Sequence, residues 1–152
     1  MTIARVLIAN RGEIAVRIVR TCRELGFETV VAVSTVDRDG MAAELADRAV
    51  VIGPAHASDS YLRVDTIVAA ALGTGCDAIH PGYGFLAESP ALASATTGAG
   101  LRFVGPPASV IATAGDKLAA RARAWPRRSC SRSPASLMPR PPPPAAAFSS
   151  TG

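Results

Sequence analysis

The sequence has few aromatic residues, and it has no apolar run long enough to cross a membrane. Aromatic residues make up 5% of the chain while hydrophobic residues make up 49%, so a core would consist mainly of Ala, Val, Ile and Leu. No apolar stretch approaches the roughly 20 residues of a membrane-spanning helix. The N-terminus enters a strand pattern directly and lacks the pattern of a signal peptide. These absences predict a cytoplasmic protein without a membrane anchor.

Cysteine is also scarce. The 152 residues include three cysteines, Cys22, Cys76 and Cys130, an odd number at wide spacing that does not indicate a disulfide framework. Cys22 and Cys76 lie in apolar segments and are predicted to be small core residues. A reducing compartment is therefore expected.

Acidic residues are absent from the last part of the chain. Residues 1–121 contain 11 basic and 12 acidic residues, whereas residues 122–152 contain five arginines and no acid. The net charge of +4 is therefore a property of the C-terminal tail. Nucleic-acid binding would depend on that tail alone, without interleaved aromatic residues or a binding fold, and is not expected.

The glycine-rich fingerprints of nucleotide-binding proteins are missing. Neither G-x-G-x-x-G nor a P-loop occurs. The turn after the first strand has one glycine, Gly12, and the next residue is Glu13, whose charge opposes an anion at a helix N-terminus. This turn is not expected to hold a dinucleotide. Asn10 and Arg11 either contact a ligand or tie the turn to neighbouring loops, and we favour the tie.

Apolar runs alternate with helical patterns along the chain. Strands are predicted at residues 5–9, 29–34, 49–52, 76–79 and 101–104, and helices at 14–25, 41–47, 61–72, 90–97 and 108–114. Gly26 is predicted to end the first helix and Ser60 to cap the third. The core face of the third helix is predicted to contain Leu62, Ile67, Val68, Ala71 and Leu72. The alternation predicts an α/β fold, a Rossmann-like parallel sheet with helices on both faces.

The segment from His80 to Ser89 follows the fourth predicted strand and is rich in side chains that can bind or polarise a ligand. It contains an imidazole, a phenol (Tyr83), a phenyl ring (Phe85) and a carboxylate (Glu88) among two glycines and a proline. Binding sites of α/β sheets lie beyond the carboxyl ends of the strands. The segment is therefore either a functional loop or an ordered turn with its two rings packed beneath it.

Each of the other candidate residues has a structural explanation as well as a functional one. Arg17, Arg20 and Glu24 share one side of the first helix, which is either a solvated face or a two-fold interface. Lys117, the only lysine, follows Asp116 at a helix start and either reaches a phosphate or lies in solvent. The two histidines, His56 and His80, have no acids or cysteines placed to form a metal site. No catalytic triad is evident.

The folding pattern stops near Arg121. Seven of the 31 residues from 122 onward are proline, and no hydrophobic period remains, which predicts a disordered tail or a proline-rich ligand. A third interpretation fits better: Arg, Pro, Ala, Ser and Gly are what GC-rich codons encode out of frame. We therefore expect a frameshift after about residue 121. Another reading frame that encodes Gly-Val-Pro and a glycine-rich lid would establish it.

Several separate stretches together resemble the N-terminal domain of biotin carboxylase. They are VLIANRGEIAVRI (6–18), SYL (60–62), IHPGYGFLAES (79–89), FVGP (103–106) and GDK (115–117). The resemblance covers about residues 3–121 and implies a Rossmann-like domain that precedes an ATP-grasp domain and a C-terminal domain. It implies carboxylation of carrier-bound biotin from ATP and bicarbonate with Mg²⁺. The implied partners are a biotin carboxyl carrier protein and a carboxyltransferase.

The resemblance also implies roles for single residues. Lys117 matches the lysine that contacts ATP, and Tyr83 and Gly84 match the loop that faces biotin and bicarbonate, with Glu88 nearby. As a set, Arg17, Arg20 and Glu24 match the dimer contact, which implies a homodimer through the first helix.

The chain departs from the family pattern because several parts of that pattern do not occur in it. The glycine-rich lid, the bicarbonate clamp, the catalytic base and the metal ligands do not occur, and Ser89 stands where many relatives have Asn. We therefore expect a wall of the site without catalytic residues or metal ligands, inactive alone and not tightly binding ATP, Mg²⁺, biotin or bicarbonate. The alternative is a non-catalytic module that docks on an intact carboxylase. A stand-alone nucleotide binder is disfavoured by the missing fingerprint. A domain without its partner would expose surface meant for burial, which predicts marginal stability.

Overall fold

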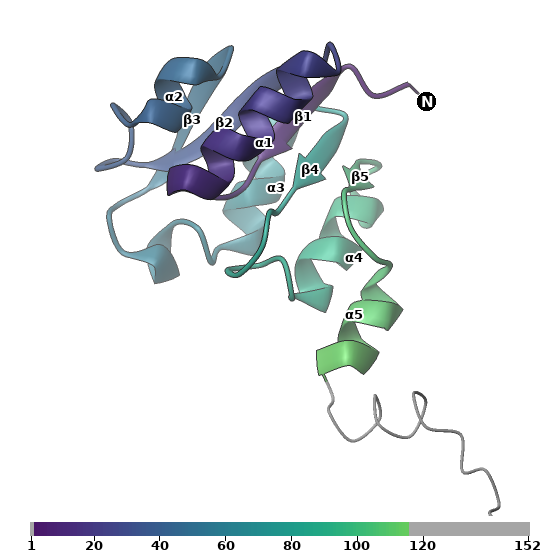
Figure 1. Cartoon of the computed structure of the whole chain (residues 1–152). Helices are drawn as coiled ribbons and strands as arrows, with labels where there is room; N and C mark the ends of the chain where they lie inside the picture. The colour runs from purple at the N-terminus through teal and green to yellow at the C-terminus, as the bar shows by residue number, and fades with distance from the viewer. Residues whose placement is uncertain (1, 116–152) are drawn as a thin grey trace, which may run out of the picture.

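A parallel sheet organises residues 2–115, the part of the chain that this computed structural model describes (Figure 1). Its strands are β1 (Arg5–Ile8), β2 (Glu28–Ser34), β3 (Arg48–Gly53), β4 (Ala78–His80) and β5 (Arg102–Phe103). The order across the sheet is β3-β2-β1-β4-β5, and every pairing is parallel. The predicted Rossmann-like sheet is confirmed. The predicted boundary at residue 121, the tail at 122–152 and Lys117 lie outside the described residues.

Helices cover both faces of the sheet, as predicted. They are α1 (Gly12–Glu24), α2 (Met41–Leu45), α3 (Val64–Gly73), α4 (Pro90–Gly98) and α5 (Ala108–Gly115), with a short 3₁₀ turn, η1, at Ala57–Asp59. Figure 1 shows α1 and α2 on one face of the sheet and α3 and α4 on the other. None of the described helices is long and apolar enough to cross a membrane.

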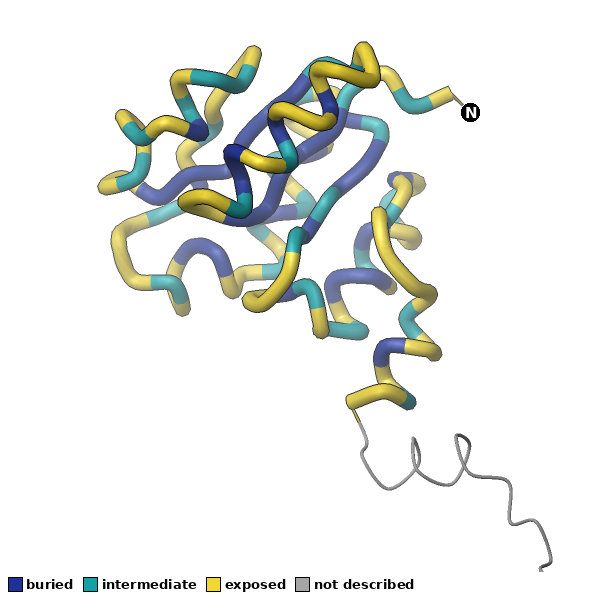
Figure 2. Tube along the Cα trace, viewed as in Figure 1, coloured by how far each residue is buried: buried dark blue, intermediate teal, exposed yellow. Residues whose placement is uncertain are grey.

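The central strand β1 supplies both cores because its successive side chains point to opposite faces. Ile8 packs with Ala15 and Val19 of α1, while Leu7 packs with Ile67 of α3 and Leu92 of α4. Both Leu7 and Ile8 are fully buried (Figure 2). A strand that is covered on both faces has apolar side chains toward both, which explains the continuous apolar run at residues 6–9.

The end of α1 follows the predicted glycine stop. Gly26 has a φ of +77°, its N–H donates to the Arg23 carbonyl at 3.0 Å, and the Phe27 N–H donates to the Cys22 carbonyl at 2.9 Å. This double closure is a Schellman motif, and glycine occupies its left-handed position without strain. Cys22 and Cys76 are buried free cysteines, as predicted, and burial raises the pKa of both thiols.

The start of α3 differs from the prediction. The helix begins at Val64 and not at residue 61, and Ser60 does not cap it, since its hydroxyl donates to the His56 carbonyl at 2.7 Å. The chain turns at residues 60–63 because Tyr61 enters the core, where it is 1% exposed.

Two of the predicted core residues of this segment lie at the surface instead. Leu62 precedes the helix and is 44% exposed, and Leu72 is 53% exposed. The later start of α3 takes Leu62 out of the helix, while the buried stripe of α3 consists of Ile67 and Ala71, with Val68 packed beside it. The prediction was therefore right for three of the five positions and wrong for the two leucines.

Candidate functional site

The loop after β4 is fixed to the end of β1 by one buried side chain. The Nδ2 atom of Asn10 donates to the Pro81 carbonyl at 2.8 Å and to the Tyr83 carbonyl at 2.9 Å, and Asn10 is fully buried. Its Oδ1 atom accepts from the Arg11 N–H at 2.9 Å. The predicted tie between this turn and a neighbouring loop is therefore confirmed for Asn10.

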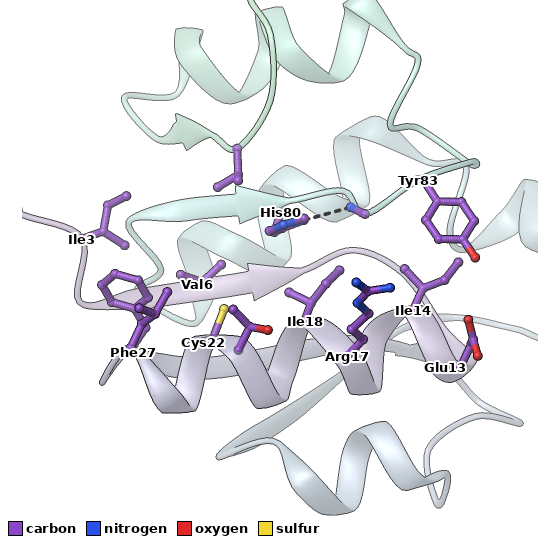
Figure 3. A pocket seen from close by; sticks show the side chains of 14 residues that line it. Ile3, Val6, Glu13, Ile14, Arg17, Ile18, Cys22, Phe27, His80 and Tyr83 are labelled. Atoms are coloured by element: carbon purple, nitrogen blue, oxygen red, sulfur yellow. Dashed lines mark hydrogen bonds between the residues drawn. The ribbon is translucent and has the colours of Figure 1, made fainter.

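Glycine is required where the loop passes over this asparagine. Gly82 has a φ of +68°, and a Cβ atom there would lie 2.7 Å from Asn10 Nδ2 and 2.9 Å from Ile14 Cγ2. The Gly82 N–H donates to Nδ1 of His80 at 3.0 Å (Figure 3). Nδ1 therefore carries a lone pair, so the proton of the neutral ring is on Nε2. Burial lowers the pKa of His80, which favours this neutral form.

The far side of the loop rests on Tyr61. Phe85, which has a φ of +43°, stacks on the Tyr61 ring with the centroids 5.3 Å apart and the planes 14° from parallel. The Tyr61 hydroxyl accepts from the Ser34 N–H at 2.9 Å and donates to Asp37 Oδ2 at 2.9 Å. Burial raises the pKa of Tyr61, so the phenol stays protonated and can donate.

An ion pair closes the network around Tyr61. Arg11 lies 3.3 Å from Asp37, and its guanidinium lies 5.9 Å from the centre of the Tyr61 ring. The carboxyl ends of β1, β2 and β4 are thus linked through Asn10, Arg11, Asp37 and Tyr61. Sequence reasoning missed the roles of Asp37 and Tyr61. The scarcity of aromatic residues was the available signal, because a ring that is buried in such a chain fills a large share of its core.

The ring of Tyr83 lies apart from this network and faces a groove. The residue is 66% exposed, and with Glu13 and Arg17 of α1 it lines a cavity of about 600 Å³ (Figure 3). His80 and Gly82 line the same cavity. Of the two rings in the loop, Phe85 stacks on Tyr61 and is 37% exposed, whereas Tyr83 is more exposed and can contact a binding partner.

Residues 2–111 match the sequence model of the family described as "Biotin carboxylase, N-terminal domain". The chain belongs to this family. It is 56% identical over 117 residues to the biotin carboxylase of Pseudomonas aeruginosa, and the match covers 77% of the chain and 26% of that enzyme. It is 53% identical over 119 residues to the mitochondrial alpha subunit of methylcrotonoyl-CoA carboxylase of Arabidopsis thaliana, covering 78% of the chain and 16% of that subunit.

Solved biotin carboxylase domains share the fold. The biotin carboxylase domain of the Hydrogenobacter thermophilus 2-oxoglutarate carboxylase, in complex with MgADP, ADP and bicarbonate, superposes with a TM-score of 0.75 at 42% identity. The superposition covers 80% of the chain and 26% of that structure. The chain therefore spans about a quarter of the biotin carboxylases it matches. The resemblance noted in the sequence is confirmed.

The structure brings together only some of the residues to which the sequence assigned roles. Tyr83 and Arg17 line one groove, whereas Glu88 is exposed and does not line it. Gly84 is exposed, has a φ of +68° and has open space where a Cβ would be. Arg20 and Glu24 are exposed on α1 together with Arg17. Lys117 lies outside the described residues.

A magnesium site does not fit the described residues. Between residues 2 and 115, no three His, Cys, Asp or Glu side chains lie close enough to hold a metal ion. A related biotin carboxylase domain was solved with MgADP. Ligands for such a Mg²⁺ ion would therefore have to come from other residues. The loop after β4 can supply shape, hydrogen-bonding groups, one exposed phenol and the exposed carboxylate of Glu88.

Replacing Asn10 with aspartate is expected to destabilise the fold by about 3 kcal/mol. The substitution keeps the shape of the side chain and removes both N–H donors, so a carboxylate oxygen would face the Pro81 and Tyr83 carbonyls. Urea unfolding of the wild-type and Asn10→Asp chains measures the difference. Glu44→Gln, a comparable change at an exposed position of α2, is the control. Equal loss in both variants would show that the tie at Asn10 does not stabilise the loop.

The stability of the fold is expected to fall between pH 7.5 and pH 5.5 through His80. Its pKa is lowered from the ordinary value of 6.5, so the unfolded chain binds the proton more readily. The contribution of His80 is complete above pH 6.5 and decreases as the pH falls below it. Hydrogen bonds lower the pKa values of three carboxyl groups from 3.8, those of Asp47, Asp65 and Asp77. Protonation of these groups therefore affects the stability of the fold only at lower pH.

Thermal melts at the two pH values check this expectation. His80→Asn should flatten the dependence, and His56→Asn, at an exposed position, should retain it. If the pH dependence persisted in His80→Asn and disappeared in His56→Asn, its source would be His56, and the expectation for His80 would be wrong.

Proposed function

We propose that this domain forms one wall of a biotin carboxylation site and that the chain has no carboxylase activity by itself. The observation that carries the proposal is the loop after β4, which Asn10 and Tyr61 hold at the carboxyl edge of the sheet while Tyr83 stands exposed. A fixed loop with one free ring is suited to position a substrate that other residues transform. Membership of the biotin carboxylase family supports the same function.

In this proposal each loop residue orients substrate and none transfers a proton. Tyr83 and Gly84 face biotin and bicarbonate, and Glu88 lies at the edge of the same surface. ATP is contacted by Lys117, and Mg²⁺ would neutralise phosphate charge when the remaining parts of an enzyme supply its ligands. The complete enzyme would work in the cytoplasm with a biotin carboxyl carrier protein and a carboxyltransferase.

The 152-residue chain is expected to show no bicarbonate-dependent ATP hydrolysis with free biotin. The described residues contain neither a phosphate-binding glycine loop nor a cluster of metal ligands. The assay compares the purified chain with the Pseudomonas aeruginosa biotin carboxylase at equal concentration. Turnover by the chain that survives further purification would overturn the proposal that it is inactive alone.

A second candidate function is supported by the outer side of α1. Arg17, Arg20 and Glu24 are all exposed there, and the two arginines border a shallow hollow of about 350 Å³. Arginine is enriched in protein interfaces. In this alternative the chain is a non-catalytic module that docks through α1 on an intact carboxylase subunit or on a second copy of itself.

Co-purification with the intact Pseudomonas aeruginosa enzyme tests this alternative. Arg17→Glu should abolish the association, whereas Arg38→Glu, at an exposed position outside α1, should leave it intact. Absence of association with the wild-type chain would end the alternative, and size-exclusion chromatography of the chain alone tests the homodimer.

A further inference from the structure

The sheet ends at β3, whose outer side is open. This strand is the first in the order β3-β2-β1-β4-β5, and among residues 2–115 no strand pairs with its outer side (Figure 1). It is six residues long and contains no proline, and its one charged residue, Arg48, stands at its first position. Proteins usually protect an edge strand with prolines, with charges or with a covering element, and an unprotected edge is a template for pairing with another strand.

The backbone groups of Ala49 and Val51 point away from the sheet. Val33 of β2 lies opposite Val51, and the Thr35 N–H, two residues further along β2, donates to the Gly53 carbonyl. The odd-numbered residues of β2 therefore bond toward β3, and in a parallel ladder each of them bonds the two neighbours of the residue opposite it. The N–H and C=O groups of residues 49 and 51 are thus left on the outer side. Both residues are exposed, and these groups form no hydrogen bond with any residue between 2 and 115.

The outward groups are placed symmetrically about Val50, which makes the edge complementary to itself. In a second copy that runs antiparallel about a two-fold axis at Val50, Ala49 lies opposite Val51 of the other copy, and Val51 lies opposite Ala49. Each of these pairs can exchange both of its backbone hydrogen bonds, so all the outward groups are satisfied. A small side chain faces a larger one in both pairs. Self-complementarity of this kind is what a two-fold interface requires.

The charges at the two ends of β3 match the same arrangement. Arg48 is exposed and forms no ion pair with any residue between 2 and 115. The two-fold axis sets it opposite Ile52 of the other copy, next to Gly53. The Asp59 carbonyl lies where a Cβ atom of residue 53 would be, and Asp59 is exposed. Each arginine therefore approaches the end of the strand that carries an acidic residue, and the two arginines do not face each other.

We propose that two copies of this chain associate through β3 and form one continuous sheet. Val50 and Ile52 belong to the core on the α3 side, so by alternation Ala49 and Val51 face the α2 side, and both faces of the sheet continue across the axis. The proposal does not depend on the proposed carboxylation function. It uses a different surface from the outer side of α1.

Engineered disulfides test the position of the axis. Val50 would lie opposite its own counterpart as a non-hydrogen-bonded pair, with the Cα atoms about 4.5 Å apart, a separation that a disulfide can bridge. The two Val51 residues would lie on a diagonal, about 7 to 8 Å apart, which a disulfide does not bridge. Val50→Cys and Val51→Cys are each made in a chain that also carries Cys130→Ser, because Cys22 and Cys76 are already buried.

Mild oxidation followed by non-reducing gel electrophoresis gives the readout. Val50→Cys is expected to form at least tenfold more linked dimer than Val51→Cys. Val51 is 53% exposed and Val50 is less exposed, so random collision between thiols would give the opposite order.

Sedimentation equilibrium over a series of concentrations measures the association itself. Val51→Pro removes one outward N–H and leaves the bonds between β3 and β2 in place, so it is expected to weaken the dimer at least tenfold. Val51→Thr keeps both the N–H and the shape of the side chain, and it should associate like the wild-type chain. Thermal melts verify that both variants fold, and the disulfide experiment stands if the proline variant does not.

Three results overturn the proposal. The first is a wild-type chain that stays monomeric at the highest concentration at which it is soluble, which would leave the edge to a strand of another protein. The second is equal linking of Val50→Cys and Val51→Cys. The third is a dimer that survives Val51→Pro and is lost in Arg17→Glu, since that result would assign the association to α1.

Discussion

A chimera that joins residues 2–111 to the remaining three quarters of the Pseudomonas aeruginosa biotin carboxylase is expected to hydrolyse ATP in a bicarbonate- and biotin-dependent manner. We propose that the chain alone lacks this activity, since residues 2–115 supply a loop and a groove and no cluster of metal ligands. The two domains are 56% identical over 117 residues, so we expect the loop to be held in a similar way. We expect turnover within roughly tenfold of the parent enzyme, which corresponds to a difference of about 1.4 kcal/mol in transition-state stabilisation.

The chimera carries its own controls. The parent enzyme sets the upper limit, and the 152-residue chain at equal concentration sets the background. A second chimera with Gly82→Val tests the geometry of the loop, because a Cβ at this residue lies 2.7 Å from Asn10 Nδ2. A chimera that melts cooperatively and has no turnover would contradict the proposed function.

Replacing Tyr61 with alanine is expected to destabilise the fold by about 3 to 5 kcal/mol, the range for large aromatic residues in cores. The ring is 1% exposed, and it supports Phe85. Small domains are stable by about 5 to 15 kcal/mol in total, so this loss would leave a marginal protein. Urea unfolding followed by circular dichroism measures it.

The only other tyrosine is the matched control. Tyr83 is 66% exposed, so Tyr83→Ala is expected to change the free energy of unfolding by less than about 0.5 kcal/mol. Tyr61→Phe separates the hydroxyl from the ring: it leaves the buried Ser34 N–H without its acceptor and should cost about 1 to 3 kcal/mol. Equal losses for Tyr61→Ala and Tyr83→Ala would contradict the central position of Tyr61.

The fold was predictable because local and tertiary preferences agree along most of the chain. The apolar run at residues 6–9 has no polar position, and the structure gives β1 a neighbouring strand on each side. Gly26 could be assigned to the end of α1 because a left-handed residue was needed there. At Ser60 the local preference and the tertiary packing disagree. A serine before an apolar helical pattern favours a cap, and the burial of Tyr61 overrides it.

Only the loop at residues 80–89 and the tie at Asn10 could be predicted from the sequence; the rest of the candidate site could not. Glycine, histidine and aromatic residues after a strand indicated the loop at 80–89, and a polar side chain at the end of the first strand indicated the tie at Asn10. The contacts of Tyr61 with Ser34 and Asp37 join residues 27 and 24 positions apart. No periodicity or spacing in the sequence specifies such pairs. The meeting of Arg17 and Tyr83 in one groove likewise depends on the packing of α1 beside β4.

The most direct test of the account is the kcat/KM for free biotin of the active chimera with and without Tyr83→Ala. The account places this exposed ring against the substrate, so we predict at least a tenfold decrease in kcat/KM with an unchanged melting temperature. Leu72→Ala, at an exposed apolar position of α3, should leave both quantities unchanged. A Tyr83→Ala chimera with the kinetics of its parent would show that the loop after β4 is not a wall of the site.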